Sequence, residues 1–127
     1  MNPHFHTDFS ISDSLIFVRK SVLIYETIID SDLRGIFEYI AFELQSPENA
    51  SGQLDRLEEQ ILSLDTMPER YRKYEKEPWK SRGLRVLPVD NYVVLYIPDN
   101  DKKVVTILRV MYAGRDIDNQ LNLHIKP

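Results

Sequence analysis

The residues best suited to chemistry stand at the ends of short apolar runs in the C-terminal half of the chain. Arg85 opens one run, and Tyr112 and Arg115 follow the last one. An arginine can hold a phosphate or a carboxylate through two parallel hydrogen bonds, and its charge is permanent. A tyrosine can transfer a proton near neutral pH only where neighbouring cations lower its pKa from about 10. The pattern therefore predicts a site for an anion on a small sheet.

Each of these residues also has a structural interpretation. Arg85 could form a surface ion pair, and Tyr112 could pack against a C-terminal helix. Arg115 could pair with Asp116 and hold the turn after the last strand. The residue types alone do not decide between these interpretations and a functional site.

Arg109 lies inside the last apolar run. Strand alternation places it on the same side as three apolar residues, Val105, Ile107 and Met111, and on the opposite side from Tyr112. An arginine among apolar neighbours is more often part of a buried ion pair than of a site. We therefore expect Arg109 and Tyr112 not to act as one constellation.

A basic segment, residues 68–82, interleaves cations with aromatic rings. Its candidate target-binding or RNA-binding residues are Arg70, Arg72, Lys73, Lys80 and Arg82. Single-stranded RNA is bound in this way, with bases stacked on rings and phosphates beside cations. The alternative is a solvated loop that Tyr71 and Trp79 anchor to the core. His4 and His6 have a spacing that could serve a metal, but two ligands in a tail favour a solvated segment.

Composition narrows the class of protein. A chain of 127 residues is long enough for one domain. Because it contains no cysteine, disulfides and thiolate chemistry are excluded. No apolar run approaches the ~20 residues that span a bilayer, and the N-terminus lacks a secretory pattern, so we expect a cytoplasmic protein. The net charge is −4, yet residues 1–65 carry four basic and twelve acidic side chains, whereas residues 66–127 carry twelve basic and eight acidic. The basic half could bind an anion locally.

Apolar spacing predicts the elements that would position these residues. A strand is expected near residues 22–25, and helical periodicity runs over 30–45 and 47–65. Ser46-Pro47-Glu48 between the helices is a strong helix start, with Ser46 as a cap. The short connection makes the two helices an antiparallel hairpin.

Three strands are expected near 83–88, 91–97 and 103–112, and Asp116 could cap a helix over 117–122. The order β-α-α-β-β-β predicts an α+β, two-layer domain, with a mostly antiparallel sheet and the helical hairpin on one face. We expect this domain to span residues 21–127, after an N-terminal arm over 1–20. The apolar run at 15–18, inside that arm, could extend the first strand.

Several short pieces stand in a distinctive order along the chain. They are Asp32-Leu33, Met67-Pro68-Glu69-Arg70, Gly83-Leu84-Arg85, Asn91-Tyr92-Val93-Val94-Leu95-Tyr96 and Arg109-Val110-Met111-Tyr112-Ala113-Gly114-Arg115-Asp116. Together, over roughly residues 21–121, they resemble the RelE/ParE family of toxins from bacterial toxin–antitoxin modules. RelE-like members of that family cut mRNA in the ribosomal A site, and ParE-like members inhibit DNA gyrase without cutting nucleic acid.

The resemblance implies a toxin that arrests growth through Arg85, Tyr112 and Arg115, as catalytic or target-contact residues. It implies a cognate antitoxin, which would land on an exposed apolar and basic surface on the sheet side, and operator DNA bound only through the antitoxin complex. No cofactor, metal or membrane is implied. The acidic total and the long hairpin favour the ParE-like branch. An mRNA endoribonuclease and a non-toxic binding module of the same fold remain alternatives.

Overall fold

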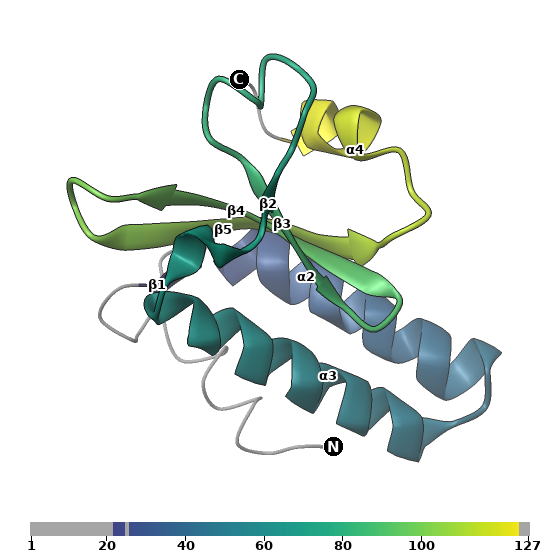
Figure 1. The fold of residues 1–127 in the computed structure, drawn as a ribbon. Coiled ribbons are helices and arrows are strands. Elements are labelled where there is room, and N and C mark those ends of the chain that lie inside the picture. The colour runs from purple at the N-terminus through teal and green to yellow at the C-terminus, as the bar shows by residue number, and fades with distance from the viewer. Residues whose placement is uncertain (1–21, 25, 125–127) are drawn as a thin grey trace.

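The computed structural model describes residues 22–24 and 26–124, which form a five-stranded sheet with helices on both faces (Figure 1). The strands are β1 (Val22–Ile24), β2 (Arg72–Lys73), β3 (Arg85–Val89), β4 (Tyr92–Asp99) and β5 (Val104–Tyr112). Their order across the sheet is β1-β5-β4-β3-β2, and β1 pairs parallel with β5 while the other pairs are antiparallel. The expected arm over 1–20, with His4 and His6, lies outside the described residues.

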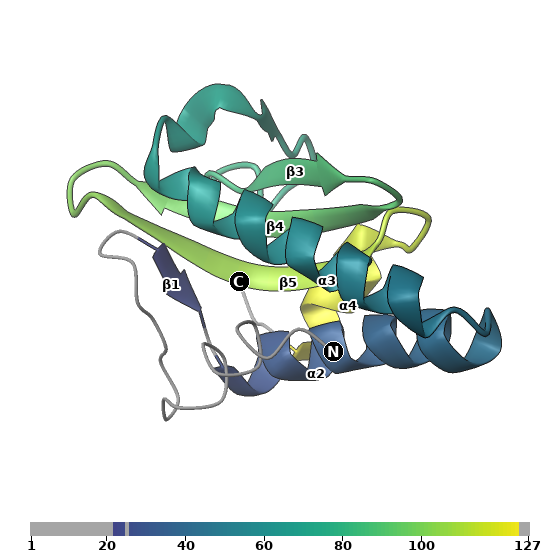
Figure 2. The same ribbon diagram turned by 90° about the horizontal axis from the view of Figure 1, so that it is seen from below.

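The predicted helical hairpin is confirmed. Helix α2 (Glu26–Glu38) continues into a π-helical turn (Tyr39–Glu43), and helix α3 (Pro47–Leu62) returns beside it on the same face of the sheet (Figure 2). The first helix begins at Glu26, before the predicted start at residue 30. Ser46 occupies the N-cap position of α3, but its side chain makes no capping hydrogen bond, so that part of the prediction is wrong. No described helix has the length and apolar character needed to cross a membrane.

The main core lies between the hairpin and the sheet. Residues at helical spacing on the two helices turn inward, and every second residue of the strands meets them. Its fully buried members include Ile29, Leu57, Ile61, Val94, Tyr96 and Ile107. Burial of one large apolar side chain contributes about 1.5–3 kcal/mol. Packing of these side chains against the sheet therefore holds both helices of the hairpin.

The opposite face of the sheet is also covered. Helix α4 (Ile117–His124) and the segment over residues 74–84 lie across it (Figure 1), and they bury a second cluster with Trp79, Leu95 and Leu121. Asp116 Oδ1 accepts a hydrogen bond from the backbone N–H of Asn119 (3.3 Å), which confirms the predicted cap of α4. The fold class is confirmed, but the prediction of an exposed apolar landing surface on this side of the sheet is wrong.

A β-bulge in β5 changes which side chains face which core. Leu95 pairs with Arg109 and Tyr96 with Ile107, so Leu108 has no partner on β4. The extra residue reverses the alternation of side chains beyond it. Val105 and Ile107 therefore pack on the hairpin side, whereas Met111 packs on the α4 side. The expected common face for these three residues is wrong, because alternation assumes an uninterrupted strand.

Arg109 forms the buried ion pair that the sequence predicted, and its partner is Asp32 of α2. Arg109 Nε and Nη2 each donate to the Asp32 carboxylate at 2.8 Å, and the backbone N–H of Val110 donates to it at 2.9 Å. Arg109 Nη1 donates to the backbone carbonyl of Gln120 in α4 (3.2 Å). Both paired side chains are only 8% exposed. One ion pair thus connects α2, β5 and α4.

A buried tyrosine fastens the segment that follows the hairpin. Tyr96 lies fully buried on β4, and its hydroxyl donates to the backbone carbonyl of Pro68 at 2.5 Å. Burial raises the pKa of Tyr96 to about 12, against a smaller opposing effect of nearby Arg85 and Arg70. The phenol therefore stays protonated in the folded chain at pH values where an exposed tyrosine ionises.

Asp32→Ala is expected to lower the free energy of unfolding by about 3–5 kcal/mol, because it leaves Arg109 buried without its counter-charge. Asp30→Ala is the matched control, since Asp30 pairs with Arg34 at the exposed surface of the same helix. Its cost should stay below ~1 kcal/mol. Urea unfolding of both variants measures the difference. Equal losses for the two would contradict a special role of the buried pair.

Tyr96 should make the folded chain lose stability as the pH rises from about 10 to about 12. The folded-state pKa lies above the unfolded one, so the contribution is complete below pH ~10 and disappears as the folded phenol ionises. Tyr96→Phe removes the hydroxyl, and its stability deficit against the unmodified chain should therefore shrink over this pH range. Urea midpoints at several pH values test this, with exposed Tyr112→Phe as the control. A deficit that does not change with pH would refute the assignment.

Candidate functional site

A recess of about 460 Å³ opens between α2 and the C-terminal end of β5. One wall consists of Ser31 and Gly35 on α2 and of Tyr39, which begins the π-helical turn after it. The other wall carries Tyr112 and Arg115, and the buried side chains of Ile36, Val110 and Met111 lie deeper in the recess. Of the candidates from sequence, this recess unites Tyr112 and Arg115.

Three tyrosines surround the recess. Tyr92 and Tyr112 meet edge to face, with ring centroids 6.1 Å apart, and Tyr39 lies on the opposing helix. Tyr92 is buried, and burial, followed by the neighbouring Tyr39 and Tyr112, raises its pKa. Tyr92 thus stays protonated near neutral pH. Tyr39 and Tyr112 are 52% and 54% exposed, so both present their rings to a partner.

Arg115 is the exposed cation of the recess. Its backbone N–H donates to the carbonyl of Tyr112 (3.1 Å) in the turn after β5, and within the described ranges its guanidinium has no ion pair. The alternative that it pairs with Asp116 is wrong, because Asp116 instead caps α4. Gly114 lets the Tyr112 ring lie against this turn, since a Cβ there would be 2.6 Å from the ring.

Arg109 also lines the recess, but three of its five N–H donors already serve contacts within the protein. Each guanidinium nitrogen donates one hydrogen bond, two of them to Asp32 and one to the Gln120 carbonyl. Asp32 is the carboxylate of the recess, and Arg109 balances its charge. Among the residues that the structure describes, no group of three or more metal-ligand side chains comes together.

Arg85 lies away from the recess and holds the chain in place. Its Nη1 donates to the backbone carbonyls of Glu69 (3.1 Å) and Tyr71 (2.7 Å), and its side chain is half-buried. Arg85 pairs with Tyr96 on β4, whereas Tyr112 lies opposite Tyr92, four residues away along β4. That separation corresponds to about 13 Å along the strand. The three residues predicted for catalysis therefore do not surround one point.

The aromatic residues of the segment over 68–82 point into the protein. Trp79 is 1% exposed and Tyr74 is buried, where its hydroxyl donates to Asp118 Oδ1 (2.6 Å). Tyr71 is half-buried against the main core. Of the two interpretations of this segment, the structure therefore favours the loop that aromatic side chains anchor.

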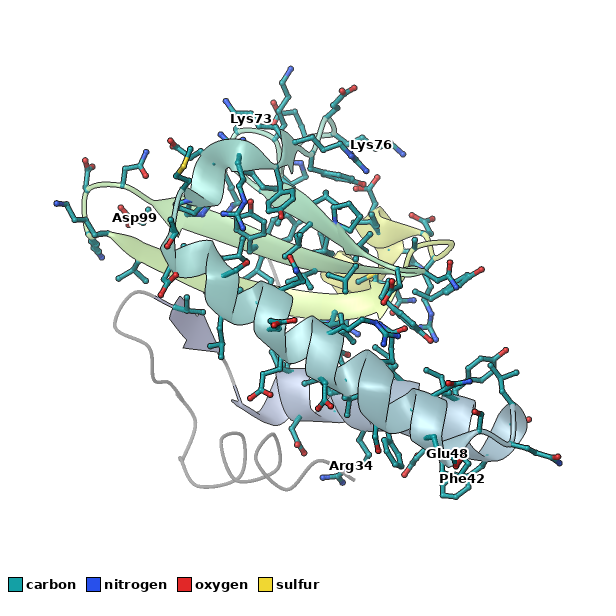
Figure 3. All side chains as sticks on the ribbon, turned by 60° about the horizontal axis from the view of Figure 1, so that its bottom comes forward. Arg34, Phe42, Glu48, Lys73, Lys76 and Asp99 are labelled. Carbon is teal, nitrogen blue, oxygen red and sulfur yellow. The ribbon has the colours of Figure 1, made fainter. Side chains whose placement is uncertain are left out.

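The predicted cations of this segment divide into two groups. Arg70 donates to the Met67 carbonyl (3.1 Å) and Ser63 Oγ (3.0 Å), and Arg82 lies over the Trp79 ring (5.8 Å). All five are exposed, but within the described residues the side chains of Arg72, Lys73 and Lys80 form no such contact. Figure 3 shows Lys73 on the far side of the molecule from Phe42, which marks the free end of the hairpin.

Sequence reasoning missed the α2 wall of the recess. Ser31, Gly35 and Tyr39 repeat at intervals of four between the apolar positions of the helix, and none of them was predicted to belong to a site. The signal was Gly35, because glycine inside a helix costs about 0.8–1.0 kcal/mol relative to alanine. A Cβ at Gly35 would meet nothing within 4 Å, so no contact in the described structure requires a glycine there.

Comparisons with known proteins agree with this architecture. The model of the family described as the ParE toxin of the type II toxin–antitoxin system parDE matches residues 23–117. A chain of the solved structure described as the chromosomal ParDE TA system from P. aeruginosa is 21% identical, with a TM-score of 0.58. The match covers 74% of this chain and 96% of that chain, and it supports the fold. No curated protein gives a significant match. Because the family model spans most of the sequence, from β1 to the start of α4, the chain belongs to the ParE toxin family of type II toxin–antitoxin systems.

Proposed function

We propose that this chain arrests bacterial growth by inhibiting DNA gyrase in the cytoplasm, and that a cognate antitoxin neutralises it. The match of the ParE toxin family over residues 23–117 carries the proposal, because that range includes the hairpin, β3 to β5 and the recess. A toxin of a type II system is held by a protein antitoxin, so the partner follows from the family. The target is the further step.

The arrangement of the candidate residues supports a non-enzymatic mode of action. Cleavage of RNA through a 2′-hydroxyl needs a base, an acid and cations around one phosphate. Tyr112 and Arg115 lie at the recess, whereas Arg85 lies about 13 Å away along the strands and donates to backbone carbonyls. A nuclease would have to assemble its site without the cation that sequence assigned to it.

The segment over residues 68–82 gives little support for RNA binding. Stacking of bases needs accessible ring faces. Trp79 and Tyr74 are buried, and the Arg70 guanidinium covers the ring of half-buried Tyr71 at 4.7 Å. The exposed cations Arg72, Lys73 and Lys80 remain available for a surface of the target protein.

We assign target contact to the recess, through Tyr112 and Arg115. Both side chains are exposed. Arg85 and Arg109, by contrast, form hydrogen bonds that connect two parts of the fold. Tyr112 offers a ring and Arg115 a charged donor, which are residue types that often dominate the energetics of protein interfaces.

Induction of this chain alone is expected to arrest growth, with filamentation and induction of the DNA-damage response, and co-expression of the adjacent reading frame should restore growth. The purified chain should inhibit negative supercoiling of a relaxed plasmid by gyrase. A natively folded chain, confirmed by circular dichroism, that leaves growth unchanged would argue for a non-toxic binding module. Arrest with cleaved mRNA and normal supercoiling activity would instead establish the endoribonuclease alternative.

Arg85→Ala and Arg115→Ala should separate a structural arginine from a contact arginine. Arg85→Ala removes charge-assisted hydrogen bonds to two carbonyls, so it should lower the free energy of unfolding by about 1.5–3 kcal/mol. Arg115→Ala should change stability by less than ~0.5 kcal/mol but weaken gyrase inhibition roughly tenfold or more. Urea unfolding and supercoiling assays measure the two effects, with Lys102→Ala as an exposed control. If the Arg85→Ala protein were as stable as the unmodified chain but not toxic, Arg85 would be a target-contact residue and the assignment made here would be wrong.

Tyr112→Phe refines the same comparison, because it removes the hydroxyl and keeps the ring. Gyrase inhibition should persist, whereas an RNA cleavage that used this phenol for proton transfer would be abolished.

A further inference from the structure

The positive charge of this chain is concentrated in the segment over residues 68–82. The segment carries six basic and three acidic residues, whereas the rest of the chain carries ten basic and seventeen acidic. Its net charge is therefore +3, and that of the remainder is −7. A long polyanion is repelled by most of the chain and attracted by this segment, so the field of the protein favours its approach from this side.

Part of the segment forms a loop whose backbone is held in place. The backbone N–H of Tyr74 donates to the carbonyl of Leu84 (2.8 Å) and closes the loop at its base, and the N–H of Lys80 donates to the carbonyl of Lys76 (2.9 Å) inside it. The Trp79 side chain, 1% exposed, fastens the loop to the second core cluster. Cations on a backbone held in this way lose less conformational entropy when they bind a partner.

Four cations of the segment remain exposed at its surface. They are Arg72, Lys73, Lys80 and Arg82. Figure 3 shows Lys73 and Lys76 at the same end of the molecule, opposite the end of the hairpin that Phe42 marks. The exposed charge of the segment therefore lies on a surface that the recess and the hairpin do not use.

Two of the three carboxylates of the segment already accept hydrogen bonds within the protein. Glu77 Oε1 accepts one from the backbone N–H of Ser81 (3.0 Å), and Glu69 Oε2 accepts one from Asn100 Nδ2. Glu75 is the acidic residue of the segment without such a contact among the described residues. The exposed cations thus outnumber the carboxylate that stands free to oppose an anion.

The composition of this surface fits the phosphate backbone of a duplex. Phosphates are held by charge and hydrogen bonds alone, whereas single-stranded RNA is also held by stacking on exposed rings. Tyr74 and Trp79 are buried, so the loop does not present those rings. Lysine is depleted at interfaces between proteins, and interfaces with DNA are much more positively charged. Duplex DNA is therefore a better match than RNA or an acidic protein surface.

Helix α4 connects the segment to the recess. Asp118 accepts a hydrogen bond from the Tyr74 hydroxyl (2.6 Å), and its other oxygen lies 3.5 Å from Lys76 Nζ. Arg115 at the recess precedes Asp118 by three residues, so the two Cα atoms are at most about 11 Å apart. A partner that contacts the recess can therefore also reach the segment with DNA that it holds.

We propose that Arg72, Lys73, Lys80 and Arg82 bind the phosphate backbone of duplex DNA, and that this DNA is held by gyrase while the recess contacts the enzyme. The inference rests on the proposed function, because DNA is the substrate of gyrase. It gives the chain two contacts with the enzyme–DNA complex, one with protein and one with phosphate. Binding by charge alone is independent of base sequence.

Binding of the full chain to a short labelled DNA duplex, followed by fluorescence anisotropy, tests the segment without gyrase. The logarithm of the binding constant should fall with the logarithm of the salt concentration, with a slope of about −3 to −4 for contact with four phosphates. Lys73→Ala and Lys80→Ala should each make this slope shallower by about 1. Each should weaken binding to unrelated duplex sequences to the same extent.

A charge-matched pair of variants separates local contact from overall charge. Lys73→Glu combined with Lys80→Glu should raise the Kd for the duplex about tenfold or more. Lys102→Glu combined with Lys103→Glu makes the same change in net charge on two exposed lysines of the β4–β5 turn, and it should change the Kd far less. Equal urea midpoints for the two double variants would show that both are folded.

Gyrase connects the DNA contact to the proposed function. The unmodified chain should bind gyrase that holds DNA about tenfold or more tightly than gyrase without DNA. Lys73→Glu combined with Lys80→Glu should remove this difference and leave binding to DNA-free gyrase unchanged. Arg115→Ala should instead weaken binding to both forms of the enzyme.

A salt slope near zero, or an equal loss of duplex binding by both double variants, would overturn the DNA site. Tighter binding of single-stranded RNA than of the duplex would assign the segment to RNA. Loss of binding to DNA-free gyrase by Lys73→Glu with Lys80→Glu would assign it to the protein surface. If the unmodified chain neither binds nor inhibits gyrase, the proposed function is wrong, and the duplex titration still decides whether the segment binds DNA.

Discussion

The ion pair between Asp32 and Arg109 is the contact on which the arrangement of this protein depends. It joins two residues 77 positions apart, and the Asp32 carboxylate accepts three hydrogen bonds from β5. The guanidinium of Arg109 and the backbone N–H of Val110 together connect α2 to β5. Arg109 also donates to the carbonyl of Gln120, which connects α4 to the same strand. Such a pair offsets the cost of burying two charges only when its geometry is complete, so its stability depends on the position of the hairpin relative to the sheet.

The recess is a consequence of that position. Because Asp32 reaches the edge of β5 beyond its pairing with β1, the next turns of α2 stand beside the end of the strand without filling the space between them. On the α2 side the recess is lined by the small residues Ser31 and Gly35, and on the strand side by Tyr92 and Tyr112. The bulge at Leu108 contributes as well, since it directs Arg109 away from the main core and toward the junction of α2 with α4. Asp32 and Arg109 therefore both hold the fold together and line the candidate site.

The basic residues of the C-terminal half serve two purposes that their sequence context does not separate. Arg70 and Arg85 donate to backbone carbonyls around residues 66–71, a segment that lacks regular pairing partners and would otherwise leave those acceptors to solvent. Within the described residues, the side chains of Arg115, Arg72, Lys73 and Lys80 form no such hydrogen bonds and are exposed. Some cations of this half thus hold its own loop in place, and fewer cations are available to contact a target than the composition indicates.

The sequence by itself determined the local elements: the hairpin, the three central strands, the cap at Asp116 and the buried character of Arg109. These features depend on the spacing of apolar residues and on backbone preferences within a few residues, and both can be read from the sequence. Tertiary structure alone decided that Asp32 is the partner of Arg109, that Arg85 belongs to a loop and not to the recess, and that α4 closes the second face. It also placed Ser31, Gly35 and Tyr39 opposite Tyr112. These relations could not be predicted because they depend on which surfaces meet over long separations, and because one unpaired residue in β5 reverses the alternation from which faces are assigned.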